Sequence, residues 1–245
     1  MMTTDILCKN CNQPVQNKYC SHCGQKTSTA RISFAHLFHE LIHGIFHIDH
    51  GFLFTARELL IRPGIMVKNY LAGHRVRYFN PFTFCVIIGG VNAYLLQKVH
   101  WQGLFIDLDI LNKKDVHQEV WNVSLKYFTY RLLLSIPFLS LVTYFFYYKK
   151  HYLFIEHLIA NTYLRAEFWL FMIISEPMEL LGNVHEMAVV TRLIFLAGGI
   201  TYMGWAYAGL FGGPLTARSF GKGIFVALTG TLLEMAMMNI LIRFF

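Results

Sequence analysis

Four cysteines in two closely spaced pairs constrain this chain more than any other feature. Cys8 and Cys11 form one Cys-x-x-Cys pair, and Cys20 and Cys23 form a second after a gap of eight residues. Each pair can direct two thiolates at one ion from a tight turn, and two pairs complete a tetrahedral shell. The spacing therefore predicts a structural zinc ribbon over residues 1–26, with all four ligand positions filled by sulfur.

Two other chemistries fit the same spacing, namely two redox-active dithiols or two disulfides. Both are weaker interpretations because the charge pattern described below places this end of the chain in the cytosol, where thiols stay reduced. Tetrahedral thiolate sites mostly hold zinc or iron, so Zn²⁺ is the expected cofactor. Gly24, directly after the second pair, supplies the permissive backbone that such a turn needs. Cys85 lies in an apolar run and is expected to be a packed thiol.

The composition of the remaining chain points to a lipid bilayer. Of 245 residues, 55% are hydrophobic, 16% are aromatic and only 14% are charged, whereas a soluble domain carries about a quarter charged residues. The net charge of +7 does not indicate nucleic acid as a partner, because the basic residues gather beside hydrophobic runs. In that position they act as topological anchors.

Five hydrophobic segments predict an all-α integral membrane protein with about five transmembrane helices in residues 81–245. A span needs about 20 residues. The third segment is the least regular, because it contains Glu176, Pro177 and Glu179; it predicts either one tilted helix starting near Tyr152 or a broken, re-entrant pair. The segments are 82–97, 131–148, 163–181, 190–211 and 223–243.

The basic residues also predict an orientation. They are frequent before the first segment, after the second and between the fourth and fifth, whereas the turn at 182–187 has no Lys or Arg. Cytosolic loops carry such an excess of positive charge. We expect a multi-pass protein of the bacterial inner membrane with its N-terminus in the cytosol.

Residues 27–80 are expected to form a linker followed by amphipathic interfacial helices. Residues 33–50 place apolar side chains on one helical face and several histidines on the other, which suits a helix lying in the membrane interface. Shorter helices are predicted over 54–61, ended by Arg62-Pro63-Gly64, and over 65–72, ended by Gly73.

His39-Glu40-Leu41-Ile42-His43 matches the H-E-x-x-H pattern, in which two histidines one turn apart bind zinc and the glutamate activates a water. The pattern does not continue into the extended form with a third histidine six residues further on. Three interpretations remain: a metalloprotease centre at His39, Glu40 and His43, a non-catalytic metal site, or the polar face of an interfacial helix.

Three glutamates, Glu176, Glu179 and Glu234, lie within or at the edges of the hydrophobic segments. An ionisable group inside a span is costly and is a functional candidate that faces the bundle interior or a water-filled path. For Glu234, the alternatives are a protonated, structural carboxyl group bonded to a neighbouring helix and the polar end of a misplaced span.

Several motifs together resemble an uncharacterised bacterial inner-membrane family, a domain of unknown function with a zinc-ribbon head and a helical membrane body. The resemblance is dense over residues 8–85 and implies architecture, location and zinc, but no reaction. The motifs that carry it are Cys8…Cys23-Gly24-Gln25, Asp49-His50-Gly51-Phe52…Thr55, Arg62-Pro63-Gly64, Tyr70-Leu71-Ala72-Gly73-His74-Arg75 and Tyr78-Phe79-Asn80-Pro81-Phe82.

These observations favour a non-enzymatic role, in which the cytosolic zinc ribbon docks a protein partner or a second copy of the chain at the membrane. One alternative is a small transporter or permease-like protein that uses Glu176, Glu179 and Glu234. The other is a membrane zinc metalloenzyme that uses His39, Glu40 and His43.

Overall fold

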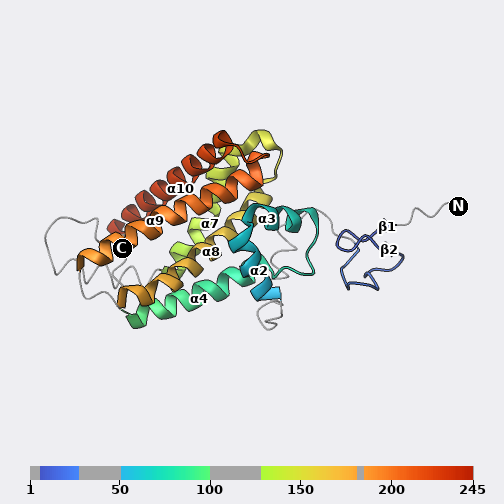
Figure 1. Ribbon diagram of the computed structural model, residues 1–245, viewed down its shortest axis with the longest axis horizontal. Helices are drawn as coiled ribbons and strands as arrows, with labels where there is room; N and C mark the ends of the chain where they lie inside the picture. Colours follow the sequence, from blue (N-terminus) through green and yellow to red (C-terminus); the bar gives the residue numbers. More distant parts are fainter. Residues whose placement is uncertain (1–5, 28–50, 100–127, 181–184, 245) are drawn as a thin grey trace.

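The computed structural model describes residues 6–27, 51–99, 128–180 and 185–244. The first of these ranges is a small head with one antiparallel strand pair, β1 (Ile6–Leu7) and β2 (Pro14–Val15). The other ranges are mostly helical, with seven α-helices among the described residues. Figure 1 shows the head beyond α3, at one end of a bundle of long helices.

Two short helices precede the bundle, as predicted. α2 (Gly51–Ile61) and α3 (Pro63–Ala72) meet at Arg62. Pro63 opens α3, where its missing N–H costs nothing. Gly73 ends α3 with a positive φ of 111°, a conformation in which glycine lacks the usual steric penalty. Both predicted helix ends are therefore confirmed, whereas the predicted helix over 33–50 lies outside the described residues.

The five hydrophobic segments form five long helices. They are α4 (Pro81–Val99), α7 (Phe128–Tyr147), α8 (Phe154–Leu180), α9 (His185–Tyr207) and α10 (Ala217–Phe244). Two short segments follow α7 and α9, a 3₁₀ turn η1 (Tyr148–Lys150) and a π-helical turn η2 (Ala208–Gly212). The third segment is one continuous helix rather than a broken pair, in agreement with the first of its two predicted forms.

Helix α8 lies at the centre of the bundle. From Ile155 to Glu167 every residue except Leu158 is buried. A helix buried on all sides has neighbours around its whole circumference, and α8 contacts α2, α3, α4, α7 and α9. The α2–α3 pair adds Leu59, Met66 and Tyr70 to the same core. Helices α2 and α3 thus pack directly on the bundle. The predicted domain boundary at residue 80 stays a prediction.

Glycines bring α9 and α10 into backbone contact. A Cβ on Gly204 would lie 2.8 Å from the backbone nitrogen of Ile224, and one on Gly223 would overlap the carbonyl oxygen of Gly204. Small residues allow helices to approach this closely. Gly198, by contrast, faces open space, because nothing lies within 4 Å of a Cβ placed there.

One described helical stretch, Leu193–Gly212, is long and apolar enough to cross a membrane. In the most apolar 18 consecutive residues of this stretch, 44% of the residues are buried inside the protein. The number of about five membrane crossings stays a prediction.

Candidate metal centre and the interior of the bundle

The head consists of two copies of one local structure, offset by twelve residues. In the first, the N–H of Cys8 donates to the Gln13 carbonyl at 2.8 Å and the N–H of Asn12 donates to the Cys8 carbonyl at 2.8 Å. The second copy repeats both bonds: Cys20 N–H to Gln25, and Gly24 N–H to Cys20, each at 2.8 Å. The flanking pairs repeat as well, since Leu7 faces Pro14 in the first copy and Tyr19 faces Lys26 in the second.

The same position in each copy adopts a left-handed backbone conformation. Gly24 has a φ of 74° and Asn12 a φ of 57°. Glycine and asparagine are the residues that tolerate this conformation best. The sequence predicts a permissive backbone at Gly24, but Asn12 was not identified. The shared pattern Cys-x-x-Cys-(Asn/Gly)-Gln in the two copies is the sequence feature that could have identified it.

The two copies bring the four sulfurs together. All four Sγ atoms lie within 4.8 Å of one another, and the Cys8–Cys23 and Cys11–Cys20 pairs are each 3.6 Å apart. Four sulfurs at about 2.3 Å from a zinc ion would form a tetrahedron with edges of about 3.8 Å. The donor set and its spacing therefore fit a tetrahedral metal ion, and all four cysteines are free rather than disulfide-bonded.

The backbone around the sulfurs favours a thiolate at Cys20. Hydrogen bonding from the Cys23 backbone, reinforced by that of His22, lowers the pKa of the Cys20 thiol to about 6. Thiolates are the form that binds metal. The head buries only Cys8, Val15 and Cys20 as its core. So small a core does not stabilise a fold by burial alone, and a metal ion held by the four sulfurs would add the missing stability.

A side-chain contact joins the head to the bundle. Gln25 is buried, and its Oε1 accepts a hydrogen bond from the Arg75 backbone N–H at 3.2 Å. The Arg75 guanidinium lies over the ring of Tyr70 in α3, 5.7 Å from its centroid. The four-cysteine cluster is thus next to the turn between α3 and α4.

The motifs around α2 and α3 have structural roles. Thr55 is fully buried, and its hydroxyl accepts the Phe79 N–H at 2.8 Å. A Cβ on Gly64 would lie 2.7 Å from the backbone of Gly209, so α3 contacts the π-helical turn directly. Asn80 caps α4, with its Oδ1 accepting two backbone N–H groups at 3.0 and 3.3 Å.

An ion pair stabilises the junction of α2 and α3. The guanidinium of Arg62 binds both carboxylate oxygens of Glu58, at 2.7 and 2.9 Å. This bidentate contact raises the pKa of Arg62 and keeps Glu58, which is 6% exposed, compensated. No catalytic geometry is associated with this pair, and its role is to hold the turn before Pro63.

A network of polar side chains connects α7, α8 and α9 inside the bundle. The amide of Asn161 donates to the Thr143 hydroxyl at 2.9 Å and accepts from the Tyr207 hydroxyl at 2.7 Å. Nδ1 of His157 lies 3.1 Å from the same threonine oxygen. These groups are all buried, so the network fixes the relative positions of three helices.

Glu167 was not among the glutamates that the sequence singled out. It is fully buried in α8, and neither carboxylate oxygen has a hydrogen-bond partner among the described residues. Its position inside the third hydrophobic segment was the available signal. The glutamates that were singled out, Glu176 and Glu179 in α8 and Glu234 in α10, have side chains outside the described part of the structure, as has the whole motif His39-Glu40-x-x-His43.

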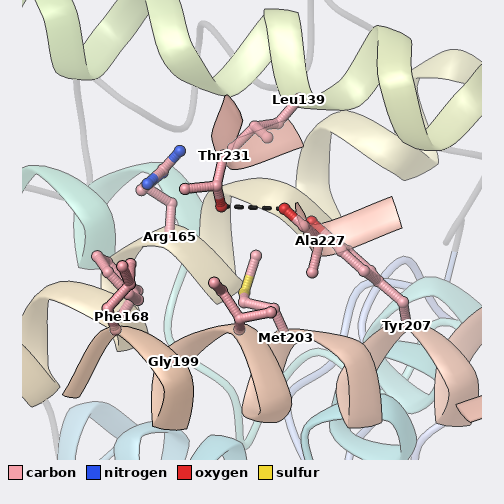
Figure 2. Close-up of a pocket in the computed structure, with 10 residues that line it drawn as sticks. Leu139, Arg165, Phe168, Gly199, Met203, Tyr207, Ala227 and Thr231 are labelled. Atoms are coloured by element: carbon pink, nitrogen blue, oxygen red, sulfur yellow. Dashed lines mark hydrogen bonds between the residues drawn. The ribbon is translucent and has the colours of Figure 1, made fainter. Parts of the chain in front are cut away.

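A small cavity lies between α7, α8, α9 and α10 (Figure 2). Its volume is about 30 Å³, enough for about one water molecule. Arg165, Tyr207 and Thr231 contribute polar groups to a mainly apolar wall, and the Thr231 hydroxyl is bonded to the Ala227 carbonyl at 2.9 Å. The cavity is too small for an organic substrate.

The described outer surface of the long helices is mainly apolar. Among their described side chains, the exposed charged ones are Arg218 and Lys222, both in the first turns of α10. Large apolar side chains are exposed instead, including Phe145 at 74%, Ile194 at 64% and Phe225 at 57%. The charged and polar side chains Arg165, Glu167 and Asn161 lie inside.

These residues define the class of the protein: a mostly helical chain with a four-cysteine head that can bind a metal ion and, among the described residues, one helix suited to crossing a membrane. Residues 49–91, from just before α2 to the middle of α4, match the family described as Protein of unknown function (DUF3667). No curated protein and no solved structure matches the chain. The expected resemblance to a family of unknown function is thus confirmed over that stretch, which excludes the cysteine head.

Proposed function

We propose that this chain is a multi-pass membrane protein whose zinc-binding head, on the cytosolic side, docks a protein partner or a second copy of the chain. The geometry of the four sulfurs carries the proposal for the head. A site whose ligand positions are all filled by cysteine leaves no open position for a substrate, so the expected role of zinc is structural.

The distribution of side chains in the bundle supports the membrane location. Water-soluble bundles place charged residues outside and apolar residues inside. Here the described interior contains Arg165 and Glu167, while the exposed sides of α7 and α10 present side chains such as Phe145 and Phe225. Ionisable residues within spans face the bundle interior in this way.

The exposed apolar residues of the head support the docking role. Leu7 and Tyr19 occupy equivalent positions in the two copies and are 58% and 55% exposed. Neither stabilises the small core around the sulfurs, and paired apolar side chains on a small polar head suit a protein interface.

The location and metal content can be tested on the full-length protein. We expect it to remain in the membrane fraction after an alkaline wash and, when purified in detergent, to contain one zinc per chain by elemental analysis. Release into the wash would contradict the membrane body, and metal-free protein from zinc-supplied cells would contradict the zinc head.

Docking can be tested by placing a photo-crosslinking amino acid at Tyr19 in cells. We expect one discrete adduct, with either a second copy of the chain or one partner, identified by mass spectrometry. The matched control has the crosslinker at Gln16, which is also exposed but lies between the two copies. Equal labelling from both positions would contradict a docking face at Leu7 and Tyr19.

A second candidate function is transport of a proton or a cation, and Glu167 is the observation that favours it. A buried carboxyl group without a described hydrogen-bond partner inside a helical bundle is a candidate for reversible proton or cation binding. Proteoliposomes with the wild-type chain should dissipate an imposed pH gradient faster than Glu167→Gln proteoliposomes. Equal rates for the two proteins would reject a proton-transport role of Glu167.

A further inference from the structure

Four cations gather where α7 ends and α10 begins. Lys149 and Lys150 lie in η1, directly after α7, and Arg218 and Lys222 lie in the first turns of α10; all four are exposed. We call these four residues the α7–α10 basic patch. Lys222 ties its two halves together, because its Nζ donates to the Phe146 carbonyl at 2.8 Å and lies 4.5 Å from the ring centroid of Tyr147.

The described surroundings of the patch contain no exposed carboxylate. Three acidic side chains are described in the structure, and all are buried: Glu58, Glu156 and Glu167. Glu156, the one nearest to η1 along the chain, accepts the Leu153 N–H at 2.8 Å. The positive charge of the patch is therefore not compensated by neighbouring described groups.

Exposed apolar side chains lead away from the patch along both helices. On α7, Leu141 and Phe145 lie on the helical face that continues into Lys149. On α10, Phe225, Leu228 and Leu232 follow Lys222 at helical spacing. An edge-on contact between Phe146 and Phe225, with ring centroids 5.7 Å apart, keeps the two faces adjacent.

We propose that the α7–α10 basic patch binds the phosphate-containing headgroup of an anionic phospholipid, whose acyl chains lie along the exposed faces of α7 and α10. The inference rests on the membrane-embedded body proposed above. Positive charge at one end of an apolar surface matches the division of a phospholipid into an anionic head and apolar tails. Exposed lysines and arginines are attracted to anionic lipid surfaces, each by an amount equal to about a fivefold change in affinity.

The test uses the full-length protein in detergent and counts bound lipids by native mass spectrometry. We expect phosphatidylglycerol to bind at least tenfold more tightly than phosphatidylcholine with the same acyl chains. A Lys149→Gln/Lys150→Gln/Arg218→Gln variant, which keeps Lys222 and its bond to Phe146, should bind phosphatidylglycerol about a hundredfold more weakly. The matched control, Lys9→Gln/Lys18→Gln/Lys26→Gln, removes three exposed cations from the head and should bind as the wild type does.

Several results would overturn the proposal. They are equal affinity for the two lipids, a loss of less than threefold in the α7–α10 variant, or the same loss in the head variant. Competition by soluble glycerol phosphate at concentrations equal to those of the lipid would also overturn it, because the acyl chains would then contribute nothing. Failure here is distinct from failure of the proposed function, since membrane fractionation and zinc content are measured on the same protein and do not depend on lipid preference.

Discussion

The head and the bundle stabilise their structures in opposite ways. The head has an apolar core of three buried residues and four sulfurs that converge on one point. The bundle has a continuous core that extends from α2 to α10 and includes charged and polar side chains. In the head, metal coordination by the four sulfurs would take the place of a large apolar core. In the bundle, close packing and internal hydrogen bonds hold long apolar helices together. Substitutions in one region should therefore leave the other largely intact.

The largest expected effect is loss of the metal. Cys20→Ser removes a ligand that is favoured as a thiolate, and zinc binding in small structural sites contributes about 10 kcal/mol or more. Elemental analysis should show less than one zinc per chain, and hydrogen exchange should show loss of protection over residues 6–27 with little change in α8. The matched control is Cys85→Ala, a buried cysteine in α4 outside the cluster, which should retain zinc. Loss of zinc from both variants would contradict the comparison.

Next in size is the effect of filling the contact between α9 and α10. Gly204→Ala places a methyl group against the backbone of Ile224 and should cost about 1–3 kcal/mol by overpacking. Thermal unfolding in detergent should occur at a lower temperature, while zinc content stays unchanged. Gly198→Ala, on the same helix but facing open space, provides the control and should be neutral. A stability loss of equal size at both positions would mean that the close approach is not what matters.

A somewhat smaller effect is expected in the buried polar network. Tyr207→Phe leaves the Asn161 Oδ1 without its donor at 2.7 Å, and an unpaired buried acceptor costs about 1–3 kcal/mol before local rearrangement. The unfolding temperature in detergent reports the change. Tyr148→Phe removes an exposed hydroxyl and should have no measurable effect; if both variants unfold alike, the network contributes little.

The smallest effects are expected from the left-handed positions of the head. In Gly24→Ala the added Cβ meets no steric obstacle, since nothing lies within 4 Å of it. Only the left-handed backbone conformation disfavours alanine there, which should destabilise the metal-bound head by about 1 kcal/mol. Asn12→Gly should relieve the same backbone conformation and therefore raise zinc affinity slightly, whereas Gly24→Ala should lower it. Competition with a chelator measures both. Equal affinity in the two variants would show that the twelve-residue repeat does not extend to backbone strain.

Sequence patterns predicted the helices of the bundle well, because each depends on a long apolar segment. The ends of α2 and α3 were also predictable, since Pro63 and Gly73 act locally. The grouping of Cys8, Cys11, Cys20 and Cys23 followed from ligand spacing. The identity of the metal remains a prediction, because zinc and iron accept the same four sulfurs.

Other features depend on which side of a helix faces inward. The central position of α8 and the burial of Glu167 could not be predicted, because α8 is surrounded by helices that are distant in sequence. Its polar residues, such as His157 and Asn161, break the apolar pattern along the chain, although in the fold they meet partners from α7 and α9. The packing of α2 and α3 on α8 was likewise not predicted, because hydrophobic periodicity does not specify which surface a short amphipathic helix covers.

The repeat in the head places different limits on chain length within each copy and between the two copies. Within each copy, the run from cysteine to glutamine is fixed, because every backbone bond in it is repeated in the other copy. Between the copies, Gln16 and Asn17 are exposed and place no sulfur, and lengthening such a linker costs only about 0.6 kcal/mol for each doubling. We therefore expect the gap between the cysteine pairs to vary in length among related chains more than the six-residue runs from cysteine to glutamine.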